Sequence, residues 1–403
     1  MKFLKSLPLY CLLLTTFSCS QQMSKATALE KKSLPILAYY VPEKDYQPEK
    51  LPLDKLTHII FSFTKVIDGE MKFSNEDFGE KLRLLVAQKK NHPHLKVMIA
   101  CGGWGADGFS DMALTEESRQ KFVKSAIAFI EAYQLDGLDI DWEYPGIPAA
   151  ETKNRVEDKR NFTLLMKALR EQMNTLGRAQ TLTFASAGWE PYYDHIEVGE
   201  VMKYADYMNI MTYDQFVGNS PYTGHHTPLG LITLDDVSAY PIIEFFQREE
   251  RKAEARDFKP GPSSVEKIVD YCIAQGVRPE QMVVGGAFYG RAWKGVPPEN
   301  NGLYQPNQGA HIGWCPYGRI RSEFENKNGY QRHWDPVAKA PYLYNPTDSI
   351  FISYDDPTSM KLKTEYAIQK KLGGIMFWQL GNDTKEENSL VDAIYEAARP
   401  ARK

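Results

Sequence analysis

The 403-residue sequence has few cysteines, no excess of charge of one sign and, after its first residues, no long hydrophobic run. Of its five cysteines only Cys101, Cys272 and Cys315 lie beyond residue 19, too few for a disulfide framework. Lysine and arginine number 48 and aspartate and glutamate 52, so the formal net charge of −4 argues against a nucleic-acid partner. The fold must therefore rest on its hydrophobic core, for which 43% of the residues are available.

The N-terminal segment has the pattern of an export signal followed by a tether. A short basic stretch precedes an apolar run over 7–17 that is too short to span a bilayer, which predicts a signal peptide over 1–18. The residues around Cys19 resemble a bacterial lipobox, in which Cys19 would carry the lipid; cleavage nearby without lipidation is the alternative. Residues 19–33 are polar and suit a tether. We expect an exported protein, either a bacterial-type lipoprotein held on the outer membrane by this lipid alone or a secreted protein.

Short apolar runs alternate with longer amphipathic stretches along most of the chain. The stretches over 116–133 and 160–176 have apolar residues at helical spacing. Apolar strands that alternate with helices predict parallel strands covered by helices, and eight such units favour a (β/α)8 TIM barrel. A doubly wound open sheet is the alternative, but no glycine-rich dinucleotide turn follows the first strand. The expected strands are 36–41, 58–64, 96–100, 137–142, 181–185, 207–212, 282–287 and 374–380.

Two stretches interrupt this alternation. Residues 292–350 are rich in aromatic residues, glycine, asparagine and proline and have little helical pattern, so we expect a small α+β insertion between the seventh and eighth strands. The barrel is then expected over 34–291 and 351–398. The segment 231–264 is highly charged and ends in a proline-rich stretch, and the sequence assigns no role to it.

An acidic ladder runs along the expected fourth strand. Asp139, Asp141 and Glu143 alternate with apolar residues, so their side chains share the face that points into the barrel. Carboxyl groups stacked ~6–7 Å apart cannot all stay ionised without a large cost, which prepares one of them to act as a general acid. A solvated acidic strand end or a Ca²⁺ or Mg²⁺ site is the alternative interpretation. The sequence contains no HExxH pair, and we expect no metal.

The segment Asp136-x-x-Asp139-x-Asp141-x-Glu143 resembles the DxxDxDxE signature of glycoside hydrolase family 18, the chitinase family. Asp136 has the opposite parity to the ladder and is interpreted as a structural residue at the start of the strand. One departure from the family's motifs is Ala100, which stands where the third-strand motif has serine. Segments that resemble the family's motifs, in the family's order, are 38–40, 57–63, 96–104, 208–214, 288–291, 354–357 and 373–378.

The resemblance implies a retaining glycosidase in which the substrate's own 2-acetamido oxygen takes the place of a carboxylate nucleophile. Glu143 would protonate the glycosidic oxygen and then activate water. Asp141 would accept a hydrogen bond from the acetamide N–H, and Asp139 would share a proton with Asp141. Tyr213 would donate its hydroxyl to the acetamide carbonyl. This chemistry implies no cofactor.

Aromatic residues are plentiful, with 23 tyrosines, 19 phenylalanines and 7 tryptophans, and flat rings suit weakly polar ligands such as sugars. The resemblance implies that Trp378 forms the floor beneath the reacting sugar. It also implies that Asp214, Tyr289 and Arg291 contact sugar hydroxyl groups. Further substrate contacts are expected from Tyr39, Phe63, Gly103, Trp104, Tyr144 and Met211.

The resemblance implies a chitinase, which hydrolyses β-1,4 linkages between N-acetylglucosamine units in chitin or its oligosaccharides. One alternative is an endo-β-N-acetylglucosaminidase that acts on glycoprotein glycans. Another is a non-catalytic sugar-binding protein on the same fold. Family members that only bind sugar typically lack the acid at the position of Glu143, and here the acid is present. We expect a monomer whose partners are these sugar chains.

Overall fold

The computed structural model of the protein describes residues 33–44, 46–253, 261–312 and 315–399. The expected signal peptide over 1–18 and the lipidation residue Cys19 lie outside these residues, as does the expected tether except for Ser33. In the described part of the chain, no helix is long and apolar enough to cross a membrane.

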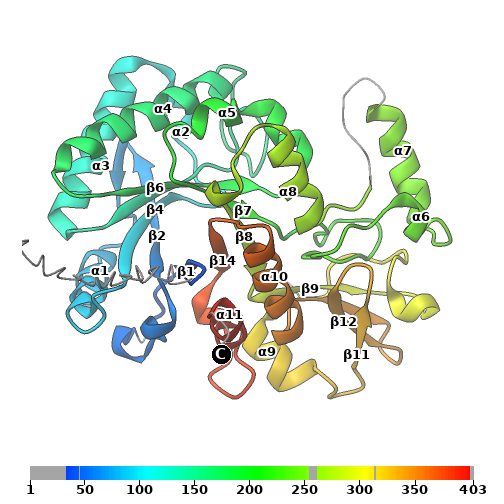
Figure 1. Ribbon diagram of the computed structural model, residues 1–403. Coiled ribbons are helices and arrows are strands. Elements are labelled where there is room, and N and C mark those ends of the chain that lie inside the picture. The colour runs from blue at the N-terminus through cyan, green and yellow to red at the C-terminus, as the bar shows by residue number, and fades with distance from the viewer. Residues whose placement is uncertain (1–32, 45, 254–260, 313–314, 400–403) are drawn as a thin grey trace, which may run out of the picture. The chain divides into compact units, whose positions relative to one another are not determined.

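Eight parallel strands close into a barrel, as the alternation of strands and helices predicted (Figure 1). The strands are β1 (Ile36–Tyr40), β2 (His58–Ile67), β4 (Lys96–Gly102), β5 (Gly137–Asp141), β6 (Thr181–Ala187), β7 (Tyr207–Met211), β8 (Met282–Ala287) and β14 (Gly374–Trp378). They pair in this order, and β14 returns to pair with β1. All eight expected strands are present. β2 is longer than expected because its end forms a hairpin with β3 (Glu70–Lys72).

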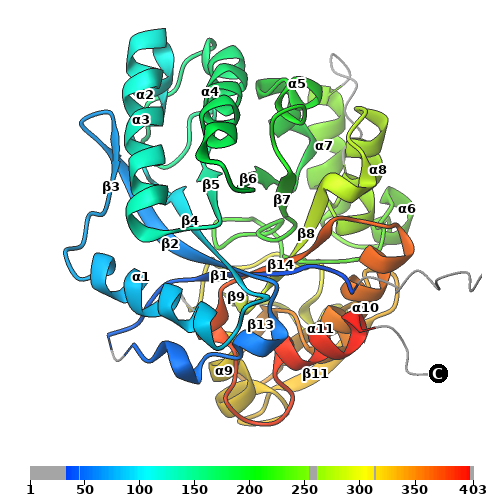
Figure 2. The ribbon, with the colours of Figure 1, turned by 60° about the vertical axis from the view of Figure 1, so that its left-hand side comes forward.

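Helices surround the barrel strands, and α3, α4, α8 and α10 lie on its outside (Figures 1 and 2). The expected helix over 116–133 is α3, which begins with a capping box between Thr115 and Ser118. The expected helix over 160–176 ends sooner, because a turn of 3-10 helix follows Met173. The helices are α1 (Phe78–Ala87), α2 (Phe109–Leu114), α3 (Glu116–Tyr133), α4 (Asp158–Met173), α5 (Val198–Val201), α6 (Leu234–Val237), α7 (Ile243–Ala253), α8 (Val265–Ala274), α9 (Tyr317–Arg319), α10 (Pro357–Gln369) and α11 (Leu390–Ala398).

Side chains of the barrel strands alternate between two apolar clusters. On β1, Leu37 and Tyr39 belong to the cluster inside the barrel, whereas Ile36, Ala38 and Tyr40 belong to the cluster between strands and helices. Strands buried on both faces have to be apolar throughout, which is why they appear in the sequence as continuous apolar runs. A polar residue at an interior position therefore stands out.

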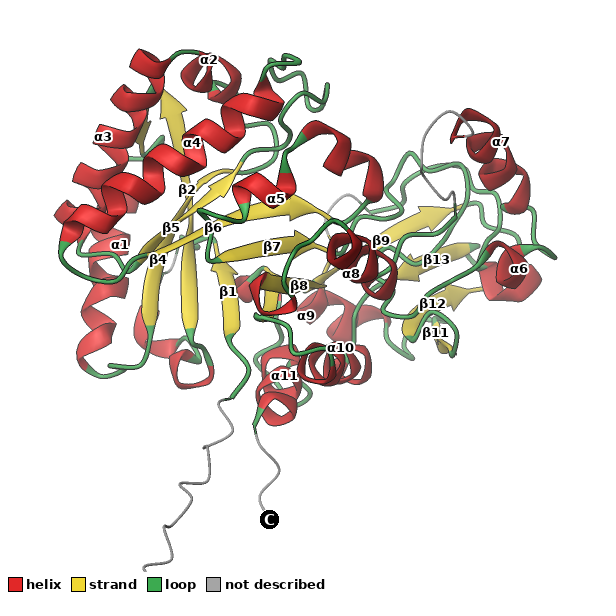
Figure 3. Cartoon of the chain, turned by 45° about the horizontal axis from the view of Figure 1, so that its top comes forward, coloured by secondary structure: helices red, strands yellow, loops and turns green. Residues whose placement is uncertain are grey.

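A second sheet, antiparallel and five-stranded, lies to one side of the barrel (Figure 3). It follows β8 in the chain and precedes α10, which is where the α+β insertion was expected, although it extends slightly beyond 292–350. Its core includes the buried side chains of Trp293, Tyr342 and Phe351. Its strands are β9 (Tyr289–Lys294), β10 (Cys315–Pro316), β11 (Gln331–Asp335), β12 (Ala340–Asn345) and β13 (Ile350–Ser353).

The sequence assigned no role to the charged segment 231–264. Its described residues 232–246 pack against this second sheet. Val237 of α6 and Ile242 and Phe246 beside or within α7 belong to the same apolar cluster as Trp293 and Phe351. Helices α6 and α7 lie beside the sheet in Figure 3. Residues 232–246 therefore complete the hydrophobic core of the insertion.

Candidate active site

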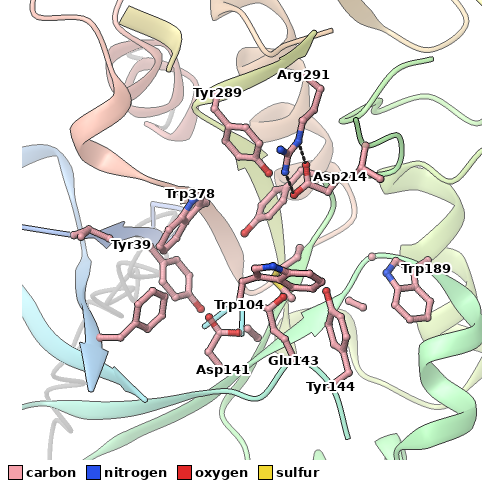
Figure 4. A pocket seen from close by; sticks show the side chains of 18 of the residues that line it. Tyr39, Trp104, Asp141, Glu143, Tyr144, Trp189, Asp214, Tyr289, Arg291 and Trp378 are labelled. Atoms are coloured by element: carbon pink, nitrogen blue, oxygen red, sulfur yellow. Dashed lines mark hydrogen bonds and ion pairs between the residues drawn. The ribbon is translucent and has the colours of Figure 1, made fainter. Parts of the chain in front are cut away.

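A cleft of about 800 Å³ opens at the carboxyl ends of the barrel strands (Figure 4). In this fold the loops that follow the strands meet at that end and form the active site. Most of the predicted site residues line the cleft. They are Tyr39, Phe63, Trp104, Asp141, Glu143, Tyr144, Met211, Tyr213, Asp214, Tyr289, Arg291 and Trp378.

Asp139 lies beneath the cleft and is fully buried. Its Oδ2 accepts a 2.9 Å hydrogen bond from the Tyr39 hydroxyl. Its Oδ1 accepts hydrogen bonds from Thr183 Oγ1 at 2.5 Å and from Asn209 Nδ2 at 3.2 Å. Ala100, which replaces the family's serine, is paired with Asp139 across β4 and β5. The carboxyl group thus receives three donors although the serine is missing.

The three carboxyl groups of the ladder are all pushed toward their protonated forms. Burial raises the pKa of Asp139 to about 6 and that of Glu143 to about 7. Burial, together with the charges of Glu143 and Asp139, also raises the pKa of Asp141. The ladder therefore holds protons near neutral pH, as a general acid requires.

Asp141 can accept a hydrogen bond from a ligand. Its Oδ1 atom is buried and has no hydrogen-bond partner among the described residues. The neighbouring strand approaches it closely at Gly102, where a Cβ atom would fall 1.9 Å from the Asp141 carbonyl oxygen. Only glycine fits there, and its φ of +127° also favours glycine.

Aromatic rings form the floor of the cleft. Trp378, at the end of β14, stacks on Phe63 with ring centroids 5.5 Å apart and an interplanar angle of 25°. Tyr39 packs against the same indole at 6.0 Å. Gly103 does not line the cleft: a Cβ there would lie 2.9 Å from the Phe63 ring, so this glycine makes room for the floor.

Asp214 and Arg291 form an ion pair on the other side of the cleft from Asp141 and Glu143 (Figure 4). Arg291 donates to both carboxylate oxygens, at 2.7 and 2.8 Å. Burial opposes ionisation of Asp214, but His226 and Arg291 outweigh it and hold the pKa of Asp214 below its usual range. This carboxylate stays charged while Glu143 retains its proton.

The rim of the cleft carries a row of aromatic side chains. The Trp104 side chain is 66% exposed and meets Tyr144 edge-on at 6.4 Å, and Tyr144 meets Trp189 at 5.6 Å. Lys65 also lines the cleft and was missed by the sequence analysis. It follows Phe63 by two residues on β2, so the predicted contact of Phe63 could have pointed to it. Alternation from Ile60 alone would place Lys65 on the outer face, because the register of β2 shifts between Ser62 and Thr64. Other lining residues that were not predicted as contacts are Val41, Ala185, Ala187, Gly188, Trp189 and Val217.

Asp136 is a structural residue, as its parity predicted. Its carboxylate accepts hydrogen bonds from Lys89 Nζ at 2.6 Å and from the Val97 backbone N–H at 2.8 Å, away from the cleft. Within the part of the chain that the structure describes, no cluster of three or more histidine, cysteine, aspartate or glutamate residues could hold a metal ion.

Comparison with known proteins agrees with this arrangement. The model of the glycosyl hydrolases family 18 matches residues 35–383, and the chain belongs to this family. Chitinase A1 from Niallia circulans is 35% identical over 307 residues, which cover 73% of this chain and 42% of that protein. The chain thus spans less than half the length of that relative.

Solved structures are similar over nearly the whole described chain. A family 18 N-acetylglucosaminidase from Paenibacillus barengoltzii superposes with a TM-score of 0.78 and 35% identity, covering 90% of this chain and 99% of that one. Chitinase ChiA74 from Bacillus thuringiensis superposes with a TM-score of 0.80 and 30% identity, covering 91% and 70%. The predicted family and barrel fold are therefore confirmed.

Proposed function

We propose that this protein is a chitinase that hydrolyses β-1,4 linkages between N-acetylglucosamine units, with retention of configuration and with assistance from the substrate's 2-acetamido group. One observation carries this proposal. Glu143, whose pKa burial raises to about 7, shares a cleft with Asp141, whose buried Oδ1 has no partner among the described residues. A protonated acid thus lies beside an unsatisfied acceptor, above an aromatic floor suited to a sugar ring.

In the first step, Glu143 gives its proton to the glycosidic oxygen as the bond from C1 to that oxygen breaks. The acetamide carbonyl oxygen attacks C1 and forms a cyclic oxazolinium ion. Asp141 accepts a hydrogen bond from the acetamide N–H and stabilises the positive charge, while Tyr213 donates to the carbonyl oxygen. Trp378 supports the sugar from below. Asp139, which lies beneath Asp141, shares a proton with it.

In the second step, the Glu143 carboxylate takes a proton from water, and the oxygen of that water attacks C1 from the face that the leaving group vacated. The bond from C1 to the acetamide oxygen breaks, so the acetamide is restored and Glu143 regains its proton. Two displacements at C1 leave the product in the β configuration. Asp214, Tyr289 and Arg291 contact sugar hydroxyl groups.

A second candidate is the release of single N-acetylglucosamine units from chain ends. The similarity to the Paenibacillus barengoltzii N-acetylglucosaminidase, which this chain covers almost completely, favours it. Both candidates use the same cleft and the same acid. They differ in the size of their products.

The test is to incubate the protein with N-acetylglucosamine oligomers of defined length and to follow product sizes and anomers by NMR. We expect short oligomers in the β form, and the glutamine variant Glu143→Gln should bind oligomers but not cleave them. Glu117→Gln, at an exposed position of α3, is the matched control and should be fully active. Early appearance of the α anomer, or cleavage by Glu143→Gln above a few per cent of the wild-type rate, would exclude this mechanism.

We also propose that residues 1–18 are a signal peptide and that Cys19 carries a lipid anchor, with 19–33 as the tether to the catalytic barrel and its insertion. The basic start, the short apolar run and Cys19 support this proposal. Cys19→Ala should move the protein from the membrane fraction to the soluble fraction. Unchanged fractionation would contradict lipidation. We expect a monomer.

A further inference from the structure

Lys65 brings a positive charge into the acidic part of the cleft. It lies on β2, two residues after Phe63, and lines the cleft together with Asp141 and Glu143. Its ammonium group donates a 2.6 Å hydrogen bond to the Gly102 carbonyl oxygen and lies 5.3 Å from the centroid of the Phe63 ring. None of the motifs used above includes this residue.

The carbonyl group that holds Lys65 belongs to the residue directly beside Asp141. Gly102 and Asp141 are partners across β4 and β5, and no side chain fits between them. A carbonyl oxygen is uncharged, so this hydrogen bond orients the ammonium group without neutralising it. Its charge therefore acts on the carboxyl groups nearby, in a cleft where partial burial limits screening by water.

Lys65 is the positive charge that favours ionisation of both Asp141 and Glu143, whereas the negative charge of Asp214 opposes it at Glu143 by raising that pKa. The positive charge of Arg291 is compensated by its bidentate contact with Asp214, which His226 also approaches. Asp139, the lowest member of the ladder, receives uncharged donors from Tyr39, Thr183 and Asn209. The remaining titratable groups near the ladder stay uncharged at neutral pH, because burial raises the pKa of Cys101 to about 12 and raises the pKa values of Tyr39, Tyr144, Tyr192 and Tyr213.

We propose that Lys65 is a positioning residue of the proposed hydrolysis, whose charge, held by the Gly102 carbonyl, sets the pH range in which Glu143 is protonated while the Asp139–Asp141 pair carries negative charge. Attraction to the ammonium group favours the ionised forms of Asp141 and Glu143 and opposes the effect of burial. Without Lys65 the carboxyl groups of Asp141 and Glu143 would hold their protons to a higher pH. The inference rests on the proposed function, since it concerns the same carboxyl groups.

Three variants separate the charge of Lys65 from its hydrogen bond. Lys65→Gln removes the charge and keeps an N–H donor for the Gly102 carbonyl. Lys65→Met removes both, and Lys65→Arg keeps both. The matched control is Lys72→Met: Lys72 is the partner of Lys65 across the β2–β3 hairpin, forms an ion pair with Glu70 at 2.6 Å and does not line the cleft.

The measurement is the pH profile of kcat/KM on N-acetylglucosamine oligomers, with thermal unfolding of each variant as a check on folding. For Lys65→Gln and Lys65→Met we expect both limbs of the profile to move to higher pH by about 0.5 to 1 unit. Lys65→Arg and Lys72→Met should retain the wild-type profile. A structural role alone would lower Tm without moving the limbs.

Two failures can be told apart. If the wild-type protein does not cleave the oligomers, the proposed function is wrong. If it does cleave them and the profile of Lys65→Gln superposes on that of the wild type, or Lys72→Met shifts it equally, only the role of Lys65 is wrong. Lys65→Gln decides the question even if Lys65→Met does not fold, because it keeps the contact to Gly102.

Discussion

The hydroxyl group of Tyr39 donates a 2.9 Å hydrogen bond to Oδ2 of Asp139 across the barrel interior, although 100 residues separate the two in the chain. Asn209 Nδ2 donates to both the Tyr39 hydroxyl, at 2.9 Å, and Asp139 Oδ1, at 3.2 Å. β1, β5 and β7 thus meet at one carboxyl group. This bond helps the buried Asp139 to ionise, since it lowers a pKa that burial raises.

Tyr39→Phe should therefore raise the pKa of Asp139 further while keeping the ring that packs on Trp378. We expect the acid limb of the kcat/KM profile to move to higher pH and kcat to fall about tenfold, as the loss of one hydrogen bond of about 1.5 kcal/mol implies. Tyr46→Phe is the control, because the Tyr46 hydroxyl is buried without a hydrogen-bond partner among the described residues. An unchanged acid limb in Tyr39→Phe would show that the Tyr39 hydroxyl does not influence the ladder.

The alkaline limb of the wild-type profile should follow Glu143. Burial raises the pKa of this carboxyl group to about 7, and the general acid acts only in its protonated form. Activity is then present below pH 7 and declines as the pH rises through this value, with kcat/KM falling about tenfold per pH unit. Initial rates on a short oligomer between pH 5 and 9 measure this. A plateau that continues to pH 9 would exclude Glu143 as an acid with this pKa.

Arg291→Met should destabilise the fold by removing the partner of Asp214. We expect the free energy of unfolding at pH 7 to fall by about 1–3 kcal/mol, measured by urea denaturation. Because the pKa of Asp214 is depressed in the folded protein, the stabilisation is present above the ordinary aspartate value of about 3.9 and is lost as the pH falls below it.

The difference between Arg291→Met and the wild type should thus be constant from pH 8 to 5 and shrink below about pH 4. The control is Arg319→Met, which removes a more exposed arginine that contacts Glu323 at 2.9 Å. It should change the free energy of unfolding by less than about 1 kcal/mol. Equal effects of the two variants would mean that the Asp214–Arg291 pair does not stabilise the fold.

Lys363→Met should be strongly destabilising. Lys363 and Asp355 are both fully buried, and Lys363 Nζ lies 2.7 Å from Asp355 Oδ2. Removing the lysine leaves a buried carboxylate without its counter-ion, which we expect to lower the free energy of unfolding by about 3–5 kcal/mol. The matched control on the same helix is Lys361→Met. Lys361 is exposed, contacts Glu365 at 3.4 Å and should contribute about 0.5 kcal/mol or less.

Adding Asp355→Asn to Lys363→Met should recover part of the lost stability, because the uncompensated charge is then gone. Asp355 also accepts hydrogen bonds from the Ala287 backbone and from Ser359, which an asparagine oxygen can partly replace. If the double variant is less stable than Lys363→Met, the loss comes from these hydrogen bonds and not from the buried charge.

The amino-acid sequence by itself determined the eight barrel strands, the insertion after the seventh and the direction of the acidic ladder. Each follows from a local rule: apolar runs alternate with amphipathic helices, and side chains alternate along a strand. Asp139 and Asp141 could be placed inside the barrel for that reason, and Asp136 outside it. Alternation did not locate Lys65, because the register of β2 shifts between Ser62 and Thr64.

Only the tertiary structure decided how far each carboxyl group is buried and what surrounds it. Asp139 lies beneath the cleft, held by donors from three other strands, and one of these donors is 100 positions away in the chain. Asp141 keeps an oxygen that has no partner among the described residues. The packing of residues 232–246 on the second sheet belongs here too. Distances across a barrel depend on how its strands close, and burial depends on every neighbour at once, so neither follows from the pattern along a single strand.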